Sequence, residues 1–455
     1  MSSIRLGLRI ELWNCMLAAI WFSLPVSAQD FPNRGPTAET LRGMVVTVSQ
    51  PASEVGLRIL DSGGNAVDAA VAIGFALAVT WPEAGNIGGG GFMLVHPSND
   101  GAPTMFDYRE CAPAAATVDM FASGTPSEYR LVGVPGTVRG LQLAHKRFGR
   151  LSWDAVVMPS VELARDGFLV SKELAKSLNG AIEANKDNRE FKRVYARDQG
   201  RRLWQAGDRL VQPDLAATLL AIANEGADAF YTGTIANAIQ AEMRRGGGLI
   251  TTDDLAAYRA VERVPVHGTY RNHDVYASCP PSSGGTVLIE MLNIAEDYNL
   301  GHDGRWSLRT LHVMTECMRR AYCDRARFLG DPDYNRIPSQ LTSKDYAGKL
   351  RETISDAEAS SSADIGADIV TPSESPNTTH FSVIDRDGMA VSNTYTLEDD
   401  FGSKIVVLGA GFLLNNEMGD FNPKPGVTDT TGLIGTKPNL VAPKKRMLSS
   451  MCPCT

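Results

Sequence analysis

The sequence predicts a folded protein of the α+β class, with α-helices and antiparallel β-strands. Three observations lead to this prediction. The composition is that of a globular chain, since 43% of the 455 residues are hydrophobic and 21% are charged. Helical periodicity recurs along the sequence from residue 52 to residue 328. Two strand-like segments joined by a turn follow near residue 380.

The first elements lie between residues 52 and 96. Small and apolar residues from Ala52 to Val79 flank a Gly-Gly-Asn turn at 63–65, which predicts two helices. The second helix is almost entirely apolar and should be buried. The glycines of 88–91 then lead into a strand-like segment, where they allow close backbone approach or positive φ. A phosphate-binding loop is not favoured, because the Lys-Ser/Thr pair is missing and a strand follows the glycines.

Further helices are expected where apolar residues recur at helical spacing. These segments are Trp153–Asp166, Leu215–Glu225, Thr234–Arg245 and Leu308–Phe328. In the last of them, His312 and Glu316 are i,i+4 neighbours, and so are Glu316 and Arg320. The two residues of each pair should therefore contact one another on one face of the helix. We interpret these pairs as structural and not as a metal site.

The segment from Thr353 to Pro376 is rich in Ser, Ala and Asp and is expected to be an exposed, mobile linker. After it, 377–384 alternates like a strand, 385–388 is a hairpin turn, and 389–397 is a second strand. A flexible segment that runs into a strand beginning with threonine is the arrangement expected of a self-processing precursor.

Residues 1–28 are predicted to be a secretory signal peptide. Arg5 and Arg9 precede an apolar run from residue 12 to 24, and the small residues 26–28 provide a cleavage point. A membrane anchor is the alternative, but the run is shorter than the ~20 apolar residues that a span needs. We therefore expect an exported protein, periplasmic or extracellular, whose mature chain has no membrane span.

Charge and cysteine content exclude other classes of protein. The net charge is -8, from 44 basic and 52 acidic residues, and no basic block is present, so a nucleic-acid partner is not expected. Seven cysteines are few for this length, so the chain is not a disulfide scaffold. No cofactor and no metal site are expected.

Thr378 is the candidate nucleophile. A threonine hydroxyl reacts poorly until a base takes its proton, and an N-terminal threonine carries such a base in its own α-amine, whose pKa is about 8 when exposed. That amine exists only after the preceding peptide bond breaks, so activation has to be coupled to cleavage. By itself the Thr378-Thr379 pair is better explained by the preference of β-branched residues for strands.

Nine sequence motifs extend the argument to nearly the whole chain. They are GGNAVDAAVA (63–72), GNIGGGGFM (85–93), FDYRECAP (106–113), GVPGTVRG (133–140), PPSSGG (280–285), NTTHFSVID (377–385), TYTL (394–397), LLNNEMGDF (413–421) and LSSM (448–451). By these motifs and their order, the sequence from about Gly43 to Met451 resembles the γ-glutamyltransferase (glutathione hydrolase) family of N-terminal-nucleophile hydrolases.

The resemblance implies a four-layer αββα sandwich and autocatalytic cleavage before Thr378. Cleavage would divide the chain into a large-subunit region (29–377) and a small-subunit region (378–455) that stay together. Thr378 matches the family's nucleophile, and Thr396 matches the residue that hydrogen-bonds the nucleophile's hydroxyl. The implied substrates are small molecules, glutathione and related γ-glutamyl compounds, with an amino acid, a peptide or water as acceptor.

The resemblance also implies a set of substrate-binding residues. Arg109 matches the arginine that binds the substrate's α-carboxylate, assisted by Ser449 and Ser450. Glu417 and Asp420 match the acidic residues that hold the α-amino group, and Glu398 lies where family members carry Asn or Glu. A γ-glutamyl group is a zwitterion, so a guanidinium and carboxylates suit its recognition. Taken singly and without the motifs, each of these residues is better explained by a surface ion pair.

Two alternatives stay open. One is a β-lactam side-chain acylase of the same fold, acting on glutaryl or cephalosporin compounds, although a glutaryl group has no ammonium for the acidic residues to hold. The other is a truncated, inactive product. Family members continue beyond LSSM and carry a Gly-Gly pair that helps form the oxyanion hole, and this sequence ends at Thr455. We therefore expect an incomplete small-subunit region, with a loss of about 100- to 1,000-fold in rate for each missing donor.

Overall fold

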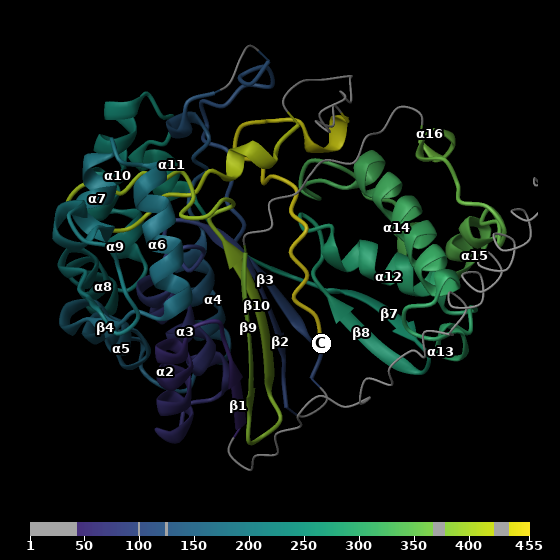
Figure 1. Ribbon diagram of the computed structural model, residues 1–455, viewed down its shortest axis with the longest axis horizontal. Helices are drawn as coiled ribbons and strands as arrows, with labels where there is room; N and C mark the ends of the chain where they lie inside the picture. The colour runs from purple at the N-terminus through teal and green to yellow at the C-terminus, as the bar shows by residue number, and fades with distance from the viewer. Residues whose placement is uncertain (1–42, 99–100, 123–125, 367–377, 423–435) are drawn as a thin grey trace, which may run out of the picture. The chain divides into compact units, whose positions relative to one another are not determined.

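A central antiparallel sheet organises the computed structural model, which describes residues 43–98, 101–122, 126–366, 378–422 and 436–455. Six strands form the sheet in the order β1 (Gly43–Val46), β9 (Thr379–Asp385), β10 (Ala390–Thr396), β2 (Gly90–His96), β3 (Thr104–Asp107) and β6 (Val261–Arg263). The first and last thirds of the chain therefore meet in one sheet (Figure 1). The expected signal peptide lies outside the described residues.

One face of this sheet is covered by a first half of the molecule, whose helices come from residues 50–257 (Figure 1). They are α2 (Gln50–Asp61), α3 (Ala66–Thr80), α4 (Thr137–Phe148), α5 (Trp153–Asp166), α6 (Lys172–Ala184), α7 (Arg189–Tyr195), α8 (Pro213–Glu225), α9 (Asp228–Tyr231), α10 (Gly233–Gly246) and α11 (Thr252–Ala257). A small sheet of β4 (Phe168–Leu169) and β5 (Arg209–Leu210) accompanies them. The predicted helices of this half are confirmed.

Helix α3 is the centre of the core. Every residue of α3 is buried, and the helix packs against β9, β10 and α5. It begins with a capping box in which the Asn65 side chain accepts from the backbone of Val67 and Asp68, while Asp68 accepts from Asn65 N. The capping box satisfies backbone donors at a buried helix end, which explains why two polar residues stand at the start of an apolar segment.

A second half lies across the sheet. It contains β7 (Val266–Tyr270), β8 (His273–Ala277), α12 (Gly284–Ala295), α13 (Leu300–Asp303), α14 (Leu308–Phe328), α15 (Lys344–Glu352) and α16 (Ser362–Ile365). Phe92, Leu94 and Met105 of the large sheet pack in one apolar cluster with Val266 and Tyr276 of the β7–β8 pair. Helix α12 packs on the other side of that pair and against α14. The layers thus follow the αββα order that the resemblance implied (Figure 1).

The predicted hairpin is confirmed as β9 and β10, with Thr379 opposite Tyr395 and Ala390 opposite Ile384. The exposure predicted for the first part of the linker is confirmed, since most residues from 353 to 364 are exposed, but this part is not without structure. Helix α16 interrupts that stretch, and Glu316 on α14 accepts a hydrogen bond from Ser360 N at 2.9 Å. A buried carboxylate on α14 therefore holds the segment before α16 in place. Residues 367–376 of the expected linker lie outside the described residues.

One of the two helical pairs predicted on α14 is absent. His312 does not contact Glu316, because its Nε2 lies 2.8 Å from the Ser355 carbonyl oxygen instead. Glu316 pairs with Arg320 at 2.6 Å, as predicted, and also with Arg319 at 2.7 Å. Two guanidinium groups outcompete one imidazole for the carboxylate. Burial alone would raise the pKa of Glu316, but hydrogen bonds from Ser360 and Arg320 lower this pKa to about 2.

The glycine run at 88–91 serves close packing. A Cβ on Gly88 would lie 2.0 Å from the Leu413 carbonyl oxygen, and one on Gly89 would lie 2.2 Å from the Thr396 carbonyl oxygen. None of the four glycines has positive φ. Of the two roles expected for these residues, close backbone approach is the one observed. Among the described residues, no helix is both long enough and apolar enough to cross a membrane.

Candidate active site

All eight site residues predicted from the sequence line a single pocket of about 420 Å³. They are Arg109, Thr378, Thr396, Glu398, Glu417, Asp420, Ser449 and Ser450. The pocket lies at the end of the β9–β10 hairpin, where β10 continues toward η4 (Glu417–Asp420). The fold therefore brings together residues that are far apart in the sequence.

Thr378 directly precedes β9 and is exposed. In the antiparallel register of the hairpin, His380 faces Thr394 and Thr379 faces Tyr395, so the next pair in this register is Thr378 and Thr396. Thr396 is 4% exposed, and its hydroxyl accepts a hydrogen bond from Glu398 N at 3.0 Å. The two predicted catalytic threonines are thus neighbours across the hairpin.

Arg109 is the buried cation of the pocket, with an exposed fraction of 1%. Its Nη1 lies 2.6 Å from Glu417 Oε2 and 3.6 Å from Glu110 Oε2, and its Nη2 pairs with Asp420. The Arg109 carbonyl oxygen accepts a hydrogen bond of 2.8 Å from the Tyr258 hydroxyl, which fixes the backbone. Arg109 does not pair with Asp107 through its side chain, because Asp107 binds Arg263 at 2.7 Å.

Three carboxylates in or beside this pocket, Glu398, Glu110 and Glu417, hold protons more strongly than carboxylates in water do. Burial raises the pKa of Glu398 to about 9, with repulsion from Asp420 adding to the shift. Burial likewise raises the pKa of Glu110 to about 8 and that of Glu417 well above its ordinary value, although Arg109 opposes both shifts. For Arg109, burial alone would lower the pKa, but the surrounding carboxylates raise it overall. An additional cation in the pocket would favour ionisation of these acids.

The serine pair lies on an extended segment held by the 280–283 stretch. Ser449 N donates to the Pro281 carbonyl oxygen at 2.9 Å, and Ser283 N donates to the Ser449 carbonyl oxygen at 2.7 Å. The Ser449 hydroxyl accepts from Met451 N at 3.0 Å. These backbone bonds fix the position of both serines at the pocket wall.

Several lining residues were not anticipated from the sequence. Arg325, His380, Thr394 and Cys452 also face the pocket. His380 Nδ1 lies 2.7 Å from the Thr394 hydroxyl, and burial lowers the pKa of this histidine. The strand period could have placed His380 on the same face as Thr378, two residues earlier. Arg325 could not have been found in this way, because it comes from helix α14.

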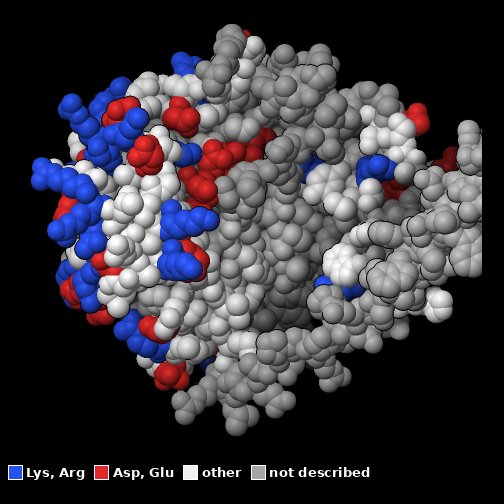
Figure 2. Space-filling view, in the orientation of Figure 1, with Lys and Arg blue, Asp and Glu red and all other residues white. Residues whose placement is uncertain are grey.

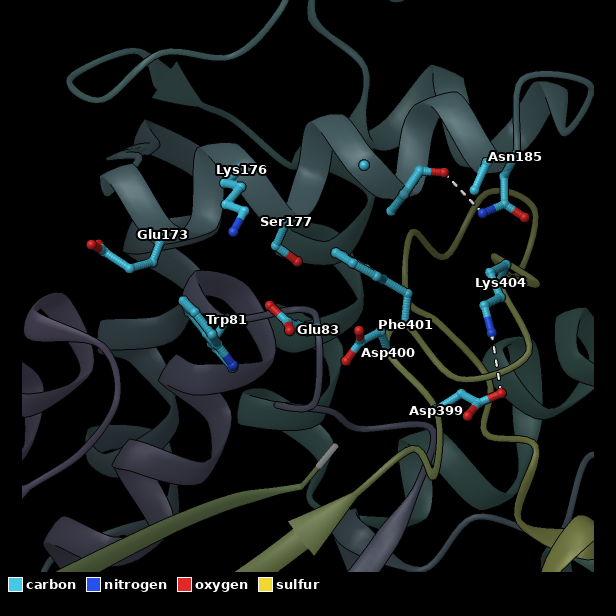
Figure 3. A pocket seen from close by; sticks show the side chains of 13 residues that line it. Trp81, Glu83, Glu173, Lys176, Ser177, Asn185, Asp399, Asp400, Phe401 and Lys404 are labelled. Atoms are coloured by element: carbon cyan, nitrogen blue, oxygen red, sulfur yellow. Dashed lines mark hydrogen bonds and ion pairs between the residues drawn. The ribbon is translucent and has the colours of Figure 1, made fainter. Parts of the chain in front are cut away.

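A strained turn follows β10 and separates this pocket from a second cavity. Glu398, Phe401 and Lys404 all have positive φ, at 83°, 61° and 61°. Asp399 and Asp400 of this turn line the second cavity, of about 710 Å³, together with Trp81 and Glu83 (Figure 3). On the face drawn in Figure 2, acidic side chains gather in one group near its middle. Three non-glycine residues with positive φ among the seven from 398 to 404 indicate backbone strain that the surrounding structure must hold.

Asn416 connects the two sides of the turn. Its Nδ2 donates to Glu398 Oε2, on the side of the first pocket, and to Asp399 Oδ2 at 3.2 Å. On the other side Asp400 lies beside Glu83, and the two carboxyl groups point toward each other in Figure 3. Burial and the nearby Glu83 raise the pKa of Asp400 to about 6.

Comparison with known proteins gives a consistent result. A family model described as gamma-glutamyltranspeptidase matches residues 52–455. The glutathione hydrolase proenzyme of Escherichia coli strain K12 is 47% identical over 421 residues, which cover 90% of this chain and 72% of that protein.

Two solved structures are similar in fold. The γ-glutamyltranspeptidase of Helicobacter pylori superposes with a TM-score of 0.70 at 40% identity, covering 72% of this chain and 97% of that chain. A cephalosporin acylase from Bacillus halodurans superposes with a TM-score of 0.80 at 28% identity, covering 94% of this chain and 77% of that chain.

Proposed function

The chain belongs to the γ-glutamyltranspeptidase family, and from this premise we propose that its pocket cleaves γ-glutamyl compounds such as glutathione, with Thr378 as the nucleophile. The observation that carries the proposal is the charge pattern of one pocket. Two guanidinium groups, two serine hydroxyls and three carboxylates line it beside the threonine. These groups complement the carboxylate and the ammonium of an α-amino acid.

The substrate's α-carboxylate would bind at Arg109. The guanidinium already pairs with Glu417 and Asp420, so the substrate has to displace one of them. Asp420 is the better candidate for displacement. Its side chain is 35% exposed, whereas the side chain of Glu417 is fully buried. Once displaced, Asp420 is available to the substrate's ammonium, which Glu398 also faces.

The reaction would proceed through an ester on Thr378. Its hydroxyl oxygen attacks the γ-carbonyl carbon of the donor while the free α-amine of Thr378 takes the hydroxyl proton. The carbonyl–nitrogen bond breaks, and the amine passes this proton to the leaving nitrogen. Water or an amine acceptor then attacks the ester and gives its proton back through the α-amine to the Thr378 oxygen. The products are glutamate or a new γ-glutamyl compound.

Thr396 would assist as a hydrogen-bond partner of the Thr378 hydroxyl. The hairpin register supports this role, because continuing it by one residue beyond the Thr379–Tyr395 pair places Thr396 opposite Thr378. The α-amine of Thr378 exists only after the preceding peptide bond is cut, so we infer a precursor that divides into regions 29–377 and 378–455. The relatives named proenzymes support such processing. We also propose export through the signal sequence at 1–28.

A β-lactam side-chain acylase remains the second candidate. It is supported by the close superposition with the cephalosporin acylase, over 94% of this chain. The two candidates differ in what binds beside Arg109, because a glutaryl group carries no ammonium. The acidic residues of the pocket therefore favour the γ-glutamyl substrate.

The test compares two chromogenic donors on the purified protein, γ-glutamyl-p-nitroanilide and glutaryl-p-nitroanilide. We expect a higher kcat/KM for the γ-glutamyl donor. A preference for the glutaryl donor would reverse the ranking. Activity with neither donor, in a protein that has been cut before Thr378, would contradict both candidates.

A further inference from the structure

We propose that Arg325 is a positioning residue, which orients the Ser450 hydroxyl so that it donates to the α-carboxylate of the γ-glutamyl substrate. This inference rests on the proposed function of the pocket. Arg325 belongs to helix α14, in the half of the molecule across the sheet from α3. No sequence motif pointed to it, yet it lines the pocket beside Ser449 and Ser450.

The geometry is a guanidinium that bridges two hydroxyl groups. Arg325 Nε donates to Ser283 Oγ at 2.9 Å, and Arg325 Nη2 donates to Ser450 Oγ at 2.9 Å. The two hydroxyl oxygens lie 3.3 Å apart. Only 8% of Arg325 is exposed, so these bonds are formed away from bulk water. Bonds in such a setting are more directional and more costly to lose than surface contacts.

The direction of each bond follows from the chemistry of the groups. A guanidinium has only donors, so both serine oxygens must accept from Arg325. A hydroxyl has a single proton, and the Ser283 hydroxyl donates its proton to the Ser449 carbonyl oxygen at 2.8 Å. The proton of Ser450 is directed away from the Arg325 guanidinium, to the Ser283 oxygen 3.3 Å away or to another acceptor. A substrate carboxylate bound at Arg109 would be such an acceptor.

The same arrangement gives a role to the PPSSGG segment. Pro281 accepts from Ser449 N, Ser283 N donates to the Ser449 carbonyl oxygen, and the Ser282 hydroxyl donates to the Met451 carbonyl oxygen. The segment therefore fixes the backbone of 449–451, while Arg325 fixes the hydroxyl of Ser450. Backbone position and proton direction are set by separate groups, which can be tested separately.

The experiment measures KM and kcat for two donors with the Arg325→Gln variant of the full chain. The first donor is γ-glutamyl-p-nitroanilide, and the second is the same compound with its α-carboxylate replaced by a carboxamide. For the first we expect KM to rise about tenfold, equivalent to the loss of about 1.4 kcal/mol of binding, while kcat stays nearly constant. For the carboxamide we expect little change, because its binding does not use the carboxylate contact.

A double-mutant cycle with Ser450→Ala tests whether Arg325 changes KM through the Ser450 hydroxyl. In the Ser450→Ala background, Arg325→Gln should have no further effect on KM. Arg327→Gln is the matched control, because Arg327 lies on the same helix but is exposed and outside the pocket. This variant should retain the parental constants with both donors.

The possible outcomes distinguish a failure of the role proposed for Arg325 from a failure of the proposed function. Equal losses with both donors, or additive effects in the cycle, would mean that Arg325 only supports the fold, and would overturn this inference. A parental protein that cleaves γ-glutamyl-p-nitroanilide while Arg325→Gln behaves identically would also overturn it and leave the proposed function standing. A parental protein that cleaves neither donor would overturn the proposed function itself.

Discussion

Arg109 and Glu417 form an ion pair, with 2.6 Å between Nη1 and Oε2, in which both side chains are almost fully buried. Arg109 follows β3 and Glu417 lies in η4, so the pair joins the two regions that cleavage before Thr378 would separate. Breaking a buried pair leaves an uncompensated charge, which is costly. The pair is therefore a fixed part of the pocket, and we expect a substrate to replace the more exposed Asp420.

Replacing Arg109 with lysine should raise KM sharply. Lysine is a point charge and cannot copy the planar two-point contact of a guanidinium with a carboxylate. Loss of such a bond corresponds to about 1.5–3 kcal/mol, or one to two decades in affinity. Steady-state kinetics with γ-glutamyl-p-nitroanilide gives the measurement. Self-cleavage should continue in this variant, because Arg109 takes no part in the proton transfers.

Arg263→Lys is the matched control for that experiment, since Arg263 pairs with Asp107 and Asp333 and does not line the pocket. It should leave KM unchanged. An unchanged KM for Arg109→Lys, together with a lower melting temperature and less complete self-cleavage, would contradict the recognition role. Arg109 would then only stabilise the fold by pairing with the nearby carboxylates.

Changing Thr378 to alanine should leave the chain uncut, whereas we expect the wild-type protein to migrate as two pieces with the smaller one beginning at Thr378. Thr378→Ser should still cleave, more slowly, because it retains the hydroxyl. Denaturing gel electrophoresis and N-terminal sequencing of the small piece provide the readout.

The neighbouring Thr379→Val variant tests which threonine of the pair reacts. Thr379 is 3% exposed and pairs with Tyr395 within the hairpin, so its side chain is enclosed by the fold. Valine matches its shape and should permit normal processing. Normal two-piece maturation of Thr378→Ala would remove Thr378 from the mechanism.

Binding of L-glutamate should release protons, and Glu398 should be a source of them. Its pKa of about 9 in the empty pocket means that it is protonated at neutral pH. A bound ammonium favours the ionised carboxylate and lowers that pKa. Affinity should therefore increase as pH rises from 7 toward 9, since less work is then needed to ionise the acid.

Calorimetry at pH 7.5 in two buffers with different ionisation enthalpies measures this release directly. Glu398→Gln should reduce the number of protons released, and Glu173→Gln, on exposed α6 surface, should not. Equal proton release by wild type and Glu398→Gln would exclude Glu398 as the group that ionises.

Asp400→Asn should stabilise the protein at neutral pH and have less effect near pH 4. The Asp400 carboxyl has a pKa of about 6 in the fold, above its ordinary value of 3.8. Between these two values the unfolded chain loses a proton that the folded chain keeps, so the stability contribution of this group falls as pH rises through that window. Asparagine does not titrate and avoids the loss.

Urea unfolding of both proteins between pH 4 and 7 tests this prediction. Asp228→Asn provides a contrast of opposite sign, because a hydrogen bond from Arg139 lowers the pKa of Asp228. A constant difference between Asp400→Asn and wild type across the range would show that Asp400 is not the titrating group.

Gly89→Ala should destabilise the protein and disturb the pocket. A Cβ at this position would meet the Thr396 carbonyl oxygen at 2.2 Å and Asn86 Oδ1 at 2.8 Å, so backbone would have to move. Overpacking of this kind costs about 1–3 kcal/mol. Gly180→Ala, where no atom lies within 4 Å on helix α6, should instead gain roughly 0.5–1 kcal/mol. Thermal denaturation of both variants would show whether the signs differ.

The sequence by itself determined the local elements of this protein and the family to which it belongs. Periodicity located α3, α5 and the β9–β10 hairpin, because burial repeats at the spacing of each element. The motifs identified eight pocket residues, since the chemistry of an amino-acid substrate requires these side-chain types. These features depend on short stretches of chain, or on residue types that the sequence states directly.

Only the tertiary structure decided how groups from distant segments face each other. It placed Arg325 of α14 behind Ser450, put His312 against Ser355 instead of Glu316, and set Asp400 beside Glu83 in a second cavity. It also surrounded Arg109 with carboxylates from three positions. Side-chain partners across the fold depend on distance, burial and competition among donors, and none of these is encoded in the spacing of residues along the chain.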